Sequence, residues 1–565
     1  MGVSPARRAG AGRPTMWRDL VRILGLWRAH RTGLLLGALV ACLAALSGVA
    51  LLSLAGHGVS QGLRHGAMAA ATGALLLLRP LILLRPVLRW MERMTTHAAT
   101  FRALADTRVW FFRRLAERLP AGIGLRRAGD LLGRLVSDVE ALDGLYLRAM
   151  APMAAATATV LAIAVLLGWA SPGLMAVVAL PLALALLLPP LLAPLAARRS
   201  AAVAEARGAL RARAVEPLLG MEDVLSNNGE ARAGARLAEA GHAQSLAEGQ
   251  ASRIGTLGGA AGALLAQAAL LGALAWGLAG GAGAAALAVP ALFLALAAAE
   301  SLATLPRAGL ALAGAGAAAR RLLEAADAPV PAPDPATPAP LPPGHAIRMR
   351  DIRFAWEAER EPVLDGFSLE IPEGARVVLL GPSGAGKSTV AALLLGLARP
   401  QSGSITLGGA EIAGLSAHDL RRRITCLTQD ARLFDDTIAA NLRLARPAAS
   451  EAELWQALDR ARIGDLVRAL PEGLETRCGE AGARFSGGQA RRLALARALL
   501  SPAPVLILDE PAAGLDVSAE RAFLETLDEA TAGRTVLLIT HRLTGAEHPT
   551  RVLRLAGGRA FHAAG

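Results

Sequence analysis

The stretch Gly381-Pro382-Ser383-Gly384-Ala385-Gly386-Lys387-Ser388 fits the pattern G-x-x-x-x-G-K-[ST] of a phosphate-binding loop. The apolar segment 377–380 before it predicts a strand, and the apolar segment 390–395 after it predicts a helix. Between these elements, glycines let backbone N–H groups close around phosphates, and the Ser388 hydroxyl is placed to hold Mg²⁺. The residues expected to bind nucleotide here are Gly381, Ser383, Gly384, Gly386, Lys387, Ser388 and Thr389.

Lys387 is the only lysine in the chain, although 59 residues are lysine or arginine. Arginine therefore serves every other basic position. A compact ammonium fits inside a glycine loop against the β and γ oxygens of a nucleotide, whereas a flat guanidinium fork does not. Position 387 thus has a chemical requirement that arginine does not meet, which supports the prediction of a nucleotide site.

The composition indicates a membrane protein of more than one domain. Its 565 residues are 53% hydrophobic and 19% charged, which is unusually apolar for a soluble enzyme of this length. The net charge of +13 favours an anionic membrane surface, because the arginines gather around the apolar runs. With only 3% aromatic residues there are few stacking platforms, which argues against a nucleic-acid partner. The three cysteines have no paired spacing, so neither a disulfide framework nor a zinc site is expected.

Six apolar stretches are long enough to cross a bilayer, which takes about 20 residues of helix. They are 33–55, 67–90, 150–169, 173–197, 255–278 and 284–305. The connections 91–149 and 198–254 are long, rich in arginine and helical in periodicity, so the membrane helices are expected to continue into the cytosol. The connections 56–66, 170–172 and 279–283 are short and almost free of arginine. The positive-inside rule then places both termini and the long connections in the cytoplasm.

A proline-rich segment divides the chain. Residues 328–344 predict a semi-extended linker, and strand and helix patterns alternate after it. The expected domains are a six-helix membrane domain at 1–327, the linker at 328–344, and an α/β nucleotide-binding domain at 345–565.

Further signals follow the phosphate loop in a fixed order. The apolar strand 505–508 ends in Asp509, placed to order the Mg²⁺ shell, and Glu510, able to polarise an attacking water as general base. The turn Ser486-Gly487-Gly488-Gln489 opens a helix, whose start offers free N–H groups to an anion. The remaining signals are Gln429 after the strand 424–428, Asp516 after the carboxylates, and His541 after the strand 536–540, where it could reach a γ-phosphate.

In this order the set closely resembles the ATP-binding cassette (ABC) ATPases over about residues 346–560. The resemblance implies ATP and Mg²⁺ as cofactors. It assigns Lys387 and Ser388 to Walker A, Asp509 and Glu510 to Walker B with its general base, and Gln429 to the Q-loop and the metal shell. It also assigns Ser486 to Gln489 to the signature, Asp516 to the D-loop, His541 to the switch histidine and Trp356 to adenine stacking. In this family the signature of one cassette caps ATP held by another. A chain with one cassette after six spans resembles an exporter half-transporter and has to pair.

The membrane half resembles one subfamily more closely. The stretch from Arg89 to Arg102 is similar to R-Y-x-E-R-x-x-x-H-D-A-T-F-R of the CydC-type subunits, and 142–148 continues the match. The resemblance implies a heterodimer with a paralogous, CydD-like half-transporter in a bacterial inner membrane. That family has been assigned export of cysteine and glutathione and, alternatively, haem handling in support of cytochrome bd assembly. Its histidine that matches His97 has been linked to haem.

Arg85, Arg89, Arg93 and His97 recur every four residues and would form one ridge on a helix. Such a ridge suits a small anionic cargo, and a neutral imidazole on it could ligate haem iron. The alternative is that these arginines snorkel to lipid phosphates. Two other functions stay open: a lipid or drug exporter that works as a homodimer, and a membrane-anchored ATPase that senses haem or redox state.

Overall fold

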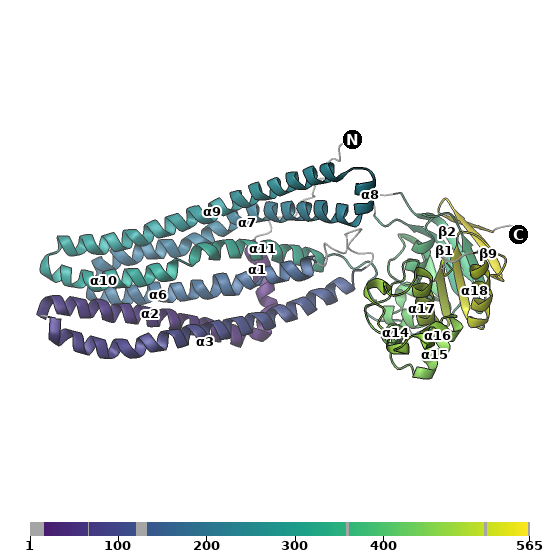
Figure 1. Cartoon of the computed structure of the whole chain (residues 1–565), viewed down its shortest axis with the longest axis horizontal. Helices are drawn as coiled ribbons and strands as arrows, with labels where there is room; N and C mark the ends of the chain where they lie inside the picture. Colours follow the sequence, from purple (N-terminus) through teal and green to yellow (C-terminus); the bar gives the residue numbers. More distant parts are fainter. Residues whose placement is uncertain (1–15, 66, 120–132, 358–360, 513–516, 563–565) are drawn as a thin grey trace. The chain divides into compact units, whose positions relative to one another are not determined.

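The computed structural model describes residues 16–65, 67–119, 133–357, 361–512 and 517–562. Contacts divide the chain into two compact units, whose boundary in the later part of the sequence falls between Asp327 and Ala328. The first unit is helical, and the second is an α/β domain (Figure 1).

Long helices build the first unit. Its α-helices are α1 (Met16–Leu26), α2 (Arg31–His65), α3 (Ala67–Ala116), α5 (Val139–Ala141), α6 (Ala151–Ala170), α7 (Pro172–Leu219), α8 (Met221–Ser226), α9 (Glu230–Ala279), α10 (Gly281–Leu302) and α11 (Leu305–Ala326). A 3₁₀ turn occupies Trp27–His30, and π-helical turns occupy Arg134–Asp138 and Gly144–Met150. Helices α3 and α9 have 50 residues each, or about 75 Å at 1.5 Å per residue. The predicted continuation of the helices beyond the apolar spans is confirmed, and α7 and α9 lie side by side with α8 between them in sequence (Figure 1).

Five stretches of the described residues are long and apolar enough to cross a membrane. They are Met16–Gly62, Leu135–Ala170, Pro172–Leu219, Glu230–Ala279 and Gly283–Ala326, and each contains one of the spans expected from the sequence. The sixth expected span, 67–90, falls on α3, where the side chains of 67–75 lie outside the described part of the chain. That span stays a prediction.

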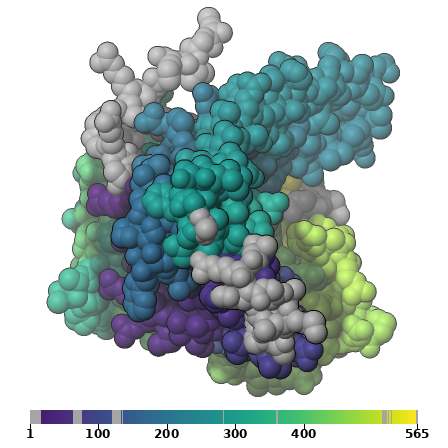
Figure 2. Space-filling view, turned by 90° about the vertical axis from the view of Figure 1, so that its left-hand side faces the viewer, coloured from purple at the N-terminus to yellow at the C-terminus, as the bar shows by residue number. Residues whose placement is uncertain are grey.

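Two of the short connections lie where the sequence predicts them. Helix α6 passes into α7 at Ser171, whose hydroxyl accepts a hydrogen bond from the backbone N–H of Leu174. Helix α9 passes into α10 at Gly280, next to Gly281 with a φ of +73°. Seen end-on, these blue and teal segments lie side by side (Figure 2).

Helix α2 runs through most of the third expected connection, 56–66, and ends at His65. A Cβ atom on Gly56 would lie 3.0 Å from the Cα of Pro290 and 3.0 Å from the Cβ of Phe293. Glycine at 56 therefore permits close packing of α2 on α10 rather than a turn, as small residues do between membrane helices. The Ser60 hydroxyl, which donates to the carbonyl of Ala286 at 2.8 Å, also ties α2 to α10.

The second unit contains two sheets. Its strands are β1 (Ile347–Phe354), β2 (Leu364–Ile371), β3 (Arg376–Leu380), β4 (Ser402–Leu407), β5 (Ala410–Glu411), β6 (Ile424–Leu427), β7 (Val505–Asp509), β8 (Thr535–Thr540), β9 (Arg551–Ala556) and β10 (Arg559–His562). One sheet is antiparallel with the order β2-β1-β4-β5, and the other has the order β10-β9-β3-β8-β7-β6. Strands β9, β3, β8, β7 and β6 are parallel to one another, and β7 is buried at every residue, as expected of a sheet covered on both faces.

Helices surround the larger sheet. They are α12 (Lys387–Leu394), α13 (Ala417–Arg423), α14 (Ile438–Arg443), α15 (Glu451–Arg460), α16 (Gly464–Ala469), α17 (Gly487–Leu500) and α18 (Val517–Ala530). The predicted strands before the phosphate loop, before the two carboxylates and before His541 are confirmed as β3, β7 and β8. Because β3, β8, β7 and β6 run parallel, the segments after them meet at one sheet edge, which is where α/β sheets bind ligands.

The proline-rich segment 328–344 has neither helix nor strand, and it is bonded to the second unit. The carboxylate of Asp334 accepts a hydrogen bond from the N–H of Ala417 at 2.8 Å, and Arg423 donates to the carbonyl of Pro342 at 3.2 Å. The N–H of Ala339 donates to the carbonyl of Gly414 at 2.8 Å. The segment therefore lies along the α/β unit.

Candidate functional site

The phosphate loop leads from β3 into α12, and its lysine folds back into it. Lys387, the first residue of α12, is 7% exposed, and its Nζ donates to the carbonyls of Gly381 at 2.8 Å and Pro382 at 3.0 Å. Gly384 and Gly386 have φ angles of +80° and +104°, which other residues rarely adopt. The ammonium thus sits inside a loop whose backbone is shaped by glycine, an arrangement that fits a nucleotide phosphate.

Trp356, two residues after β1, contacts the first turn of α12. Its indole N–H donates to the hydroxyl of Thr389 at 3.2 Å, and its ring meets Phe354 edge-on at a centroid distance of 5.0 Å. The side chain is 44% exposed. An anchored and partly open indole is suited to stacking on a flat base.

Ser388 and Asp509 bring two oxygen ligands together. The Ser388 hydroxyl donates to Oδ2 of Asp509 at 2.7 Å, and Asp509 is 2% exposed at the end of β7. Burial raises the pKa of Asp509, while the hydrogen bond from Ser388 and the charge of Lys387 lower it. A hydroxyl beside a carboxylate fits Mg²⁺, which prefers oxygen ligands and takes the rest of its shell from phosphate and water. In the part of the chain that the structure describes, no group of three His, Cys, Asp or Glu side chains forms a separate metal site.

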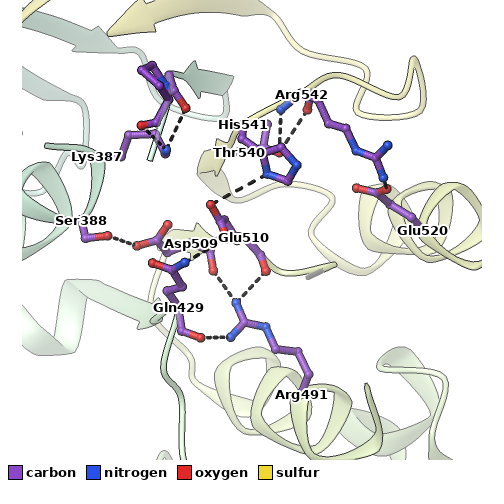
Figure 3. Close-up of polar contacts among 12 residues, drawn as sticks. Lys387, Ser388, Gln429, Arg491, Asp509, Glu510, Glu520, Thr540, His541 and Arg542 are labelled. Atoms are coloured by element: carbon purple, nitrogen blue, oxygen red, sulfur yellow. Dashed lines mark hydrogen bonds and ion pairs between the residues drawn. The ribbon is translucent and has the colours of Figure 1, made fainter. Parts of the chain in front are cut away.

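Three of the predicted catalytic side chains meet at Glu510 (Figure 3). The amide of Gln429 donates to Oε2 of Glu510 at 3.1 Å, and Nδ1 of His541 lies 3.9 Å from Oε1. Glu510 has a φ of +48°, a strained conformation for this residue, and its N–H donates to the carbonyl of Ile539 at 2.9 Å. The backbone of β8 thus holds the carboxylate where Gln429 and His541 converge on it.

The signature turn opens α17 with a capping box. The Ser486 hydroxyl accepts from the N–H of Gln489 at 3.3 Å, and the N–H of Ser486 donates to the side-chain carbonyl of Gln489 at 2.9 Å. Ser486 and Gly487 are exposed, while Gly488 and Gln489 are half-buried. Among the described residues, no hydrogen bond joins this turn to the phosphate loop of the same chain. Asp516, the expected D-loop residue, lies outside the described residues.

Sequence reasoning missed the contacts of Arg491, two residues after the signature. Its guanidinium donates to the carbonyl of Thr428 at 3.1 Å. It also donates to the carbonyls of Gln429, Asp509 and Glu510, the last at 2.6 Å (Figure 3). Burial lowers the pKa of Arg491, whereas the nearby Asp509 and Glu510 carboxylates raise it. No pattern in the sequence distinguishes this arginine from its neighbour Arg492.

The cationic ridge of the first unit is not free along its whole length. Arg85 donates to both carboxylate oxygens of Glu300 on α10, at 2.6 and 2.7 Å, and Arg89 donates to one of them at 2.8 Å. Arg93 and His97 follow on the exposed face of α3, and the His97 ring meets Phe101 edge-on at 5.6 Å. Two of the residues expected to bind cargo, Arg85 and Arg89, are therefore paired with Glu300, which is distant in the sequence.

Comparisons with known proteins agree with this geometry. The family model described as "ABC transporter" matches residues 364–513, and one described as "AAA domain, putative AbiEii toxin, Type IV TA system" matches 483–544. The solved structure described as "Structure of a bacterial Atm1-family ABC exporter with ATP bound" has a TM-score of 0.79 at 26% identity. The alignment covers 97% of this chain and 95% of that one.

Several relatives match over most of the chain. The glutathione/L-cysteine transport system protein CydC of Escherichia coli is 32% identical over 96% of both chains. CydD of Bacillus subtilis, named for the same kind of transport system, is 31% identical over 84% of this chain and 83% of its own length. The ATP-dependent lipid A-core flippase of Saccharophagus degradans is 42% identical, but over only 39% of this chain and 38% of its own.

Proposed function

Because the chain belongs to the family of ABC exporter subunits that includes CydC and CydD, we propose that it is the CydC-like half of a heterodimeric exporter for small thiols such as cysteine or glutathione. It is a membrane-embedded bacterial transporter subunit that couples ATP hydrolysis to transport. The convergence of Gln429 and His541 on Glu510, beside the Ser388–Asp509 pair, supports ATP hydrolysis. The match to CydC over 96% of both chains supports the thiol cargo and the paralogous partner.

In the proposed mechanism each side chain has one task. Trp356 stacks on adenine, and the ammonium of Lys387 exchanges its loop carbonyls for phosphate oxygens. Ser388, Asp509 and Gln429 would hold Mg²⁺, which would supply positive charge to neutralise the transferred phosphoryl group. Glu510 accepts a proton from the attacking water, and His541, beside it, contacts the γ-phosphate.

The partner completes the ATP site in this proposal. The signature turn is partly exposed and, within the described residues, is not bonded to its own phosphate loop. Its free N–H groups at a helix start suit a phosphate held by a second cassette. We propose a CydD-like paralogue as that second half, Asp516 as a further contact, and a cytoplasmic position for both termini and the ATPase unit.

The cargo site is proposed at the ridge of α3. Arg85, Arg89 and Arg93 offer guanidinium groups that pair well with carboxylates, and Glu300 occupies two of them. Charges within a span usually serve function, and an anionic thiol compound would compete with Glu300 for these arginines. The lipid-phosphate alternative predicts that anionic lipid, rather than thiol, contacts the same residues.

Transport by the assembled pair tests the function. We expect inverted vesicles that contain this chain and its paralogue to take up labelled glutathione or cysteine only with Mg²⁺ and ATP. Vesicles carrying Glu510→Gln serve as the matched control, because they hold the same protein without its general base. Wild-type vesicles that hydrolyse ATP but move no thiol would disprove the cargo and favour a sensing ATPase.

Haem is a separate proposal that rests on His97. Its imidazole lies on the exposed face of α3, one turn from Arg93, so His97 would offer a nitrogen ligand to haem iron and Arg93 a partner for a propionate. We expect His97→Ala to abolish any Soret absorbance of the purified complex, while the control His57→Ala on α2 leaves it in place. An unchanged Soret band in His97→Ala would remove this role.

A cavity in the first unit favours a second candidate, export of lipid. It has a volume of about 310 Å³ and is lined mainly by small and apolar residues of α7, α9 and α11, among them Leu188, Gly258 and Gly309. The flippase match, however, spans 39% of this chain, against 96% for CydC. Stimulation of ATP hydrolysis by lipid but not by thiol, in a homodimer, would favour this alternative.

A further inference from the structure

Arg491 joins two catalytic loops to the helix that carries the signature. One terminal nitrogen donates to the carbonyls of Thr428 and Gln429, after β6, and the other donates to those of Asp509 and Glu510, after β7. Strands β6 and β7 are neighbours, with Leu427 opposite Leu508, so one guanidinium fork reaches both loops. The side chain therefore bonds the backbone on each side of the Gln429–Glu510 contact.

These contacts suit the shape of arginine. A planar guanidinium presents donors in a fixed fork, whereas the ammonium of lysine is a point charge on a flexible stem. Each of the two terminal nitrogens serves two carbonyls, so removing the side chain leaves four acceptors without this donor. One of them belongs to Glu510, whose φ of +48° makes its backbone costly to hold in place.

Arg491 also lies in the first turns of α17, whose first turn is the signature. Ser486 caps this helix and Gln489 is its third residue, so Arg491 moves with the signature as one rigid element. A shift of α17 is therefore transmitted to the backbone of Gln429 and Glu510 without passing through the rest of the fold.

We propose that Arg491 is a positioning residue that couples this chain's general base to the nucleotide held by the partner. The inference rests on the proposed function, in which the signature of this chain caps the partner's ATP. When that ATP is bound, α17 is fixed, and Arg491 holds Glu510 and Gln429 in the hydrolytic arrangement. When it is absent, α17 is free to shift and the base loses its position, so this chain hydrolyses its own ATP efficiently only while the partner's ATP is bound.

The test uses the assembled half-transporter pair in lipid and compares Arg491→Gln with two relatives. Arg491→Lys keeps the charge but not the fork. Arg492→Gln is the matched control, since the next residue of α17 bonds only the carbonyl of Arg462, at 3.4 Å, in the described contacts. We expect Arg491→Gln to lower kcat by about 10²-fold, the loss that follows a small misplacement of a catalytic group. The KM for ATP should stay within about twofold, the pattern of a group that acts only in the transition state.

The coupling itself needs a second measurement. Single-turnover hydrolysis at this chain's site is compared between an intact partner and a partner disabled for ATP binding. The slowing factor is the single-turnover rate with the intact partner divided by the rate with the disabled partner. It should be well above one in the wild-type chain and in Arg492→Gln. In Arg491→Gln and Arg491→Lys it should fall towards one. ATP affinity and the melting temperature of the complex report whether each variant is folded.

The outcomes separate this inference from the proposed function. An unchanged slowing factor in a folded Arg491→Gln complex would mean that Arg491 only stabilises the two loops, and it would overturn the coupling. Full kcat in Arg491→Gln would overturn the positioning role as well. A wild-type pair without Mg²⁺-dependent hydrolysis would instead disprove the proposed function, before any variant is compared.

Discussion

At the scale of single residues, Glu510 is the position where the proposed chemistry depends on one proton acceptor. Glu510→Gln keeps the size of the side chain and its contact with Gln429, but an amide does not accept the proton of water. We expect ATP binding to persist and kcat to fall by about 10²- to 10⁴-fold, the usual contribution of a general base. Steady-state hydrolysis and nucleotide binding by the assembled complex measure both. The control is Glu525→Gln, a surface carboxylate paired with Arg521, and undiminished hydrolysis in Glu510→Gln would refute the assignment.

Asp509 gives a pH-dependent prediction. Burial raises its pKa above the ordinary value of 3.8, so ionised Asp509 destabilises the Mg²⁺-free fold at neutral pH. For a raised pKa, the stabilising contribution is complete below the unfolded-state value and is lost as the pH rises through the folded-state value. Asp509→Asn should therefore raise the melting temperature in EDTA at pH 7.5 and abolish Mg²⁺-dependent hydrolysis.

The gain in melting temperature should shrink as the pH falls through the raised folded-state pKa of Asp509, and it should vanish below the ordinary value of 3.8, where the wild-type carboxyl is protonated in both states. Scans in EDTA across this range provide the measurement. A gain that does not change with pH would show that packing, and not ionisation of Asp509, explains it.

The two cysteines of the ATPase unit should be unreactive in the folded protein. Burial raises the pKa of Cys426 to about 12 and that of Cys478 to about 11. At pH 8 both therefore stay thiols, and the thiolate is the reactive form. In a Cys42→Ser background, we expect iodoacetamide to modify neither until the protein is unfolded, as read by mass spectrometry. Rapid labelling of either thiol in the native complex would contradict the burial and the raised pKa of that cysteine.

At the scale of elements, the contact of α2 with α10 depends on Gly56. Alanine there would place a Cβ atom 3.0 Å from Pro290 and Phe293, whereas alanine at Gly62, on the same helix, would meet no atom within 4 Å. We expect Gly56→Ala to destabilise the complex by about 1–3 kcal/mol, the usual cost of overpacking. Gly62→Ala should be neutral or stabilising, because alanine favours helix over glycine. Thermal unfolding in detergent compares the two, and equal melting temperatures would refute the close packing.

The same elements show what the sequence predicts and what it does not. Strands β3, β7 and β8 and the residues that follow them are predictable, because an apolar run ending in Asp509 or His541 is a local pattern. The course of α2 through Gly56 is not, since the glycine serves a contact with α10 more than two hundred residues away. The pairing of Glu300 with Arg85 and the four carbonyl contacts of Arg491 are equally non-local, and no spacing encodes them.

At the scale of the whole molecule, the remaining question is what the chain pairs with. Among the described residues, the signature turn is not bonded to the phosphate loop of the same chain. In the proposed function a second cassette completes the ATP site, so hydrolysis is expected to depend on that cassette. The match to CydC over 96% of both chains favours a different, paralogous second half, whereas a flippase-like exporter would use a second copy of itself.

We therefore expect the purified chain alone to hydrolyse ATP at least about tenfold more slowly, per cassette, than the complex with its CydD-like paralogue, because orienting reacting groups accounts for much of catalysis. Mass measurement of the complex in detergent, with steady-state hydrolysis on the same sample, gives both composition and rate. The control is the complex that carries Glu510→Gln in this chain. It should keep the same subunit composition and lose the ATP hydrolysis that this chain contributes. A fully active homodimer that ignores the paralogue would refute the heterodimer and make the lipid exporter the better description, since the cavity beside Gly258 and Gly309 would then lie in both halves.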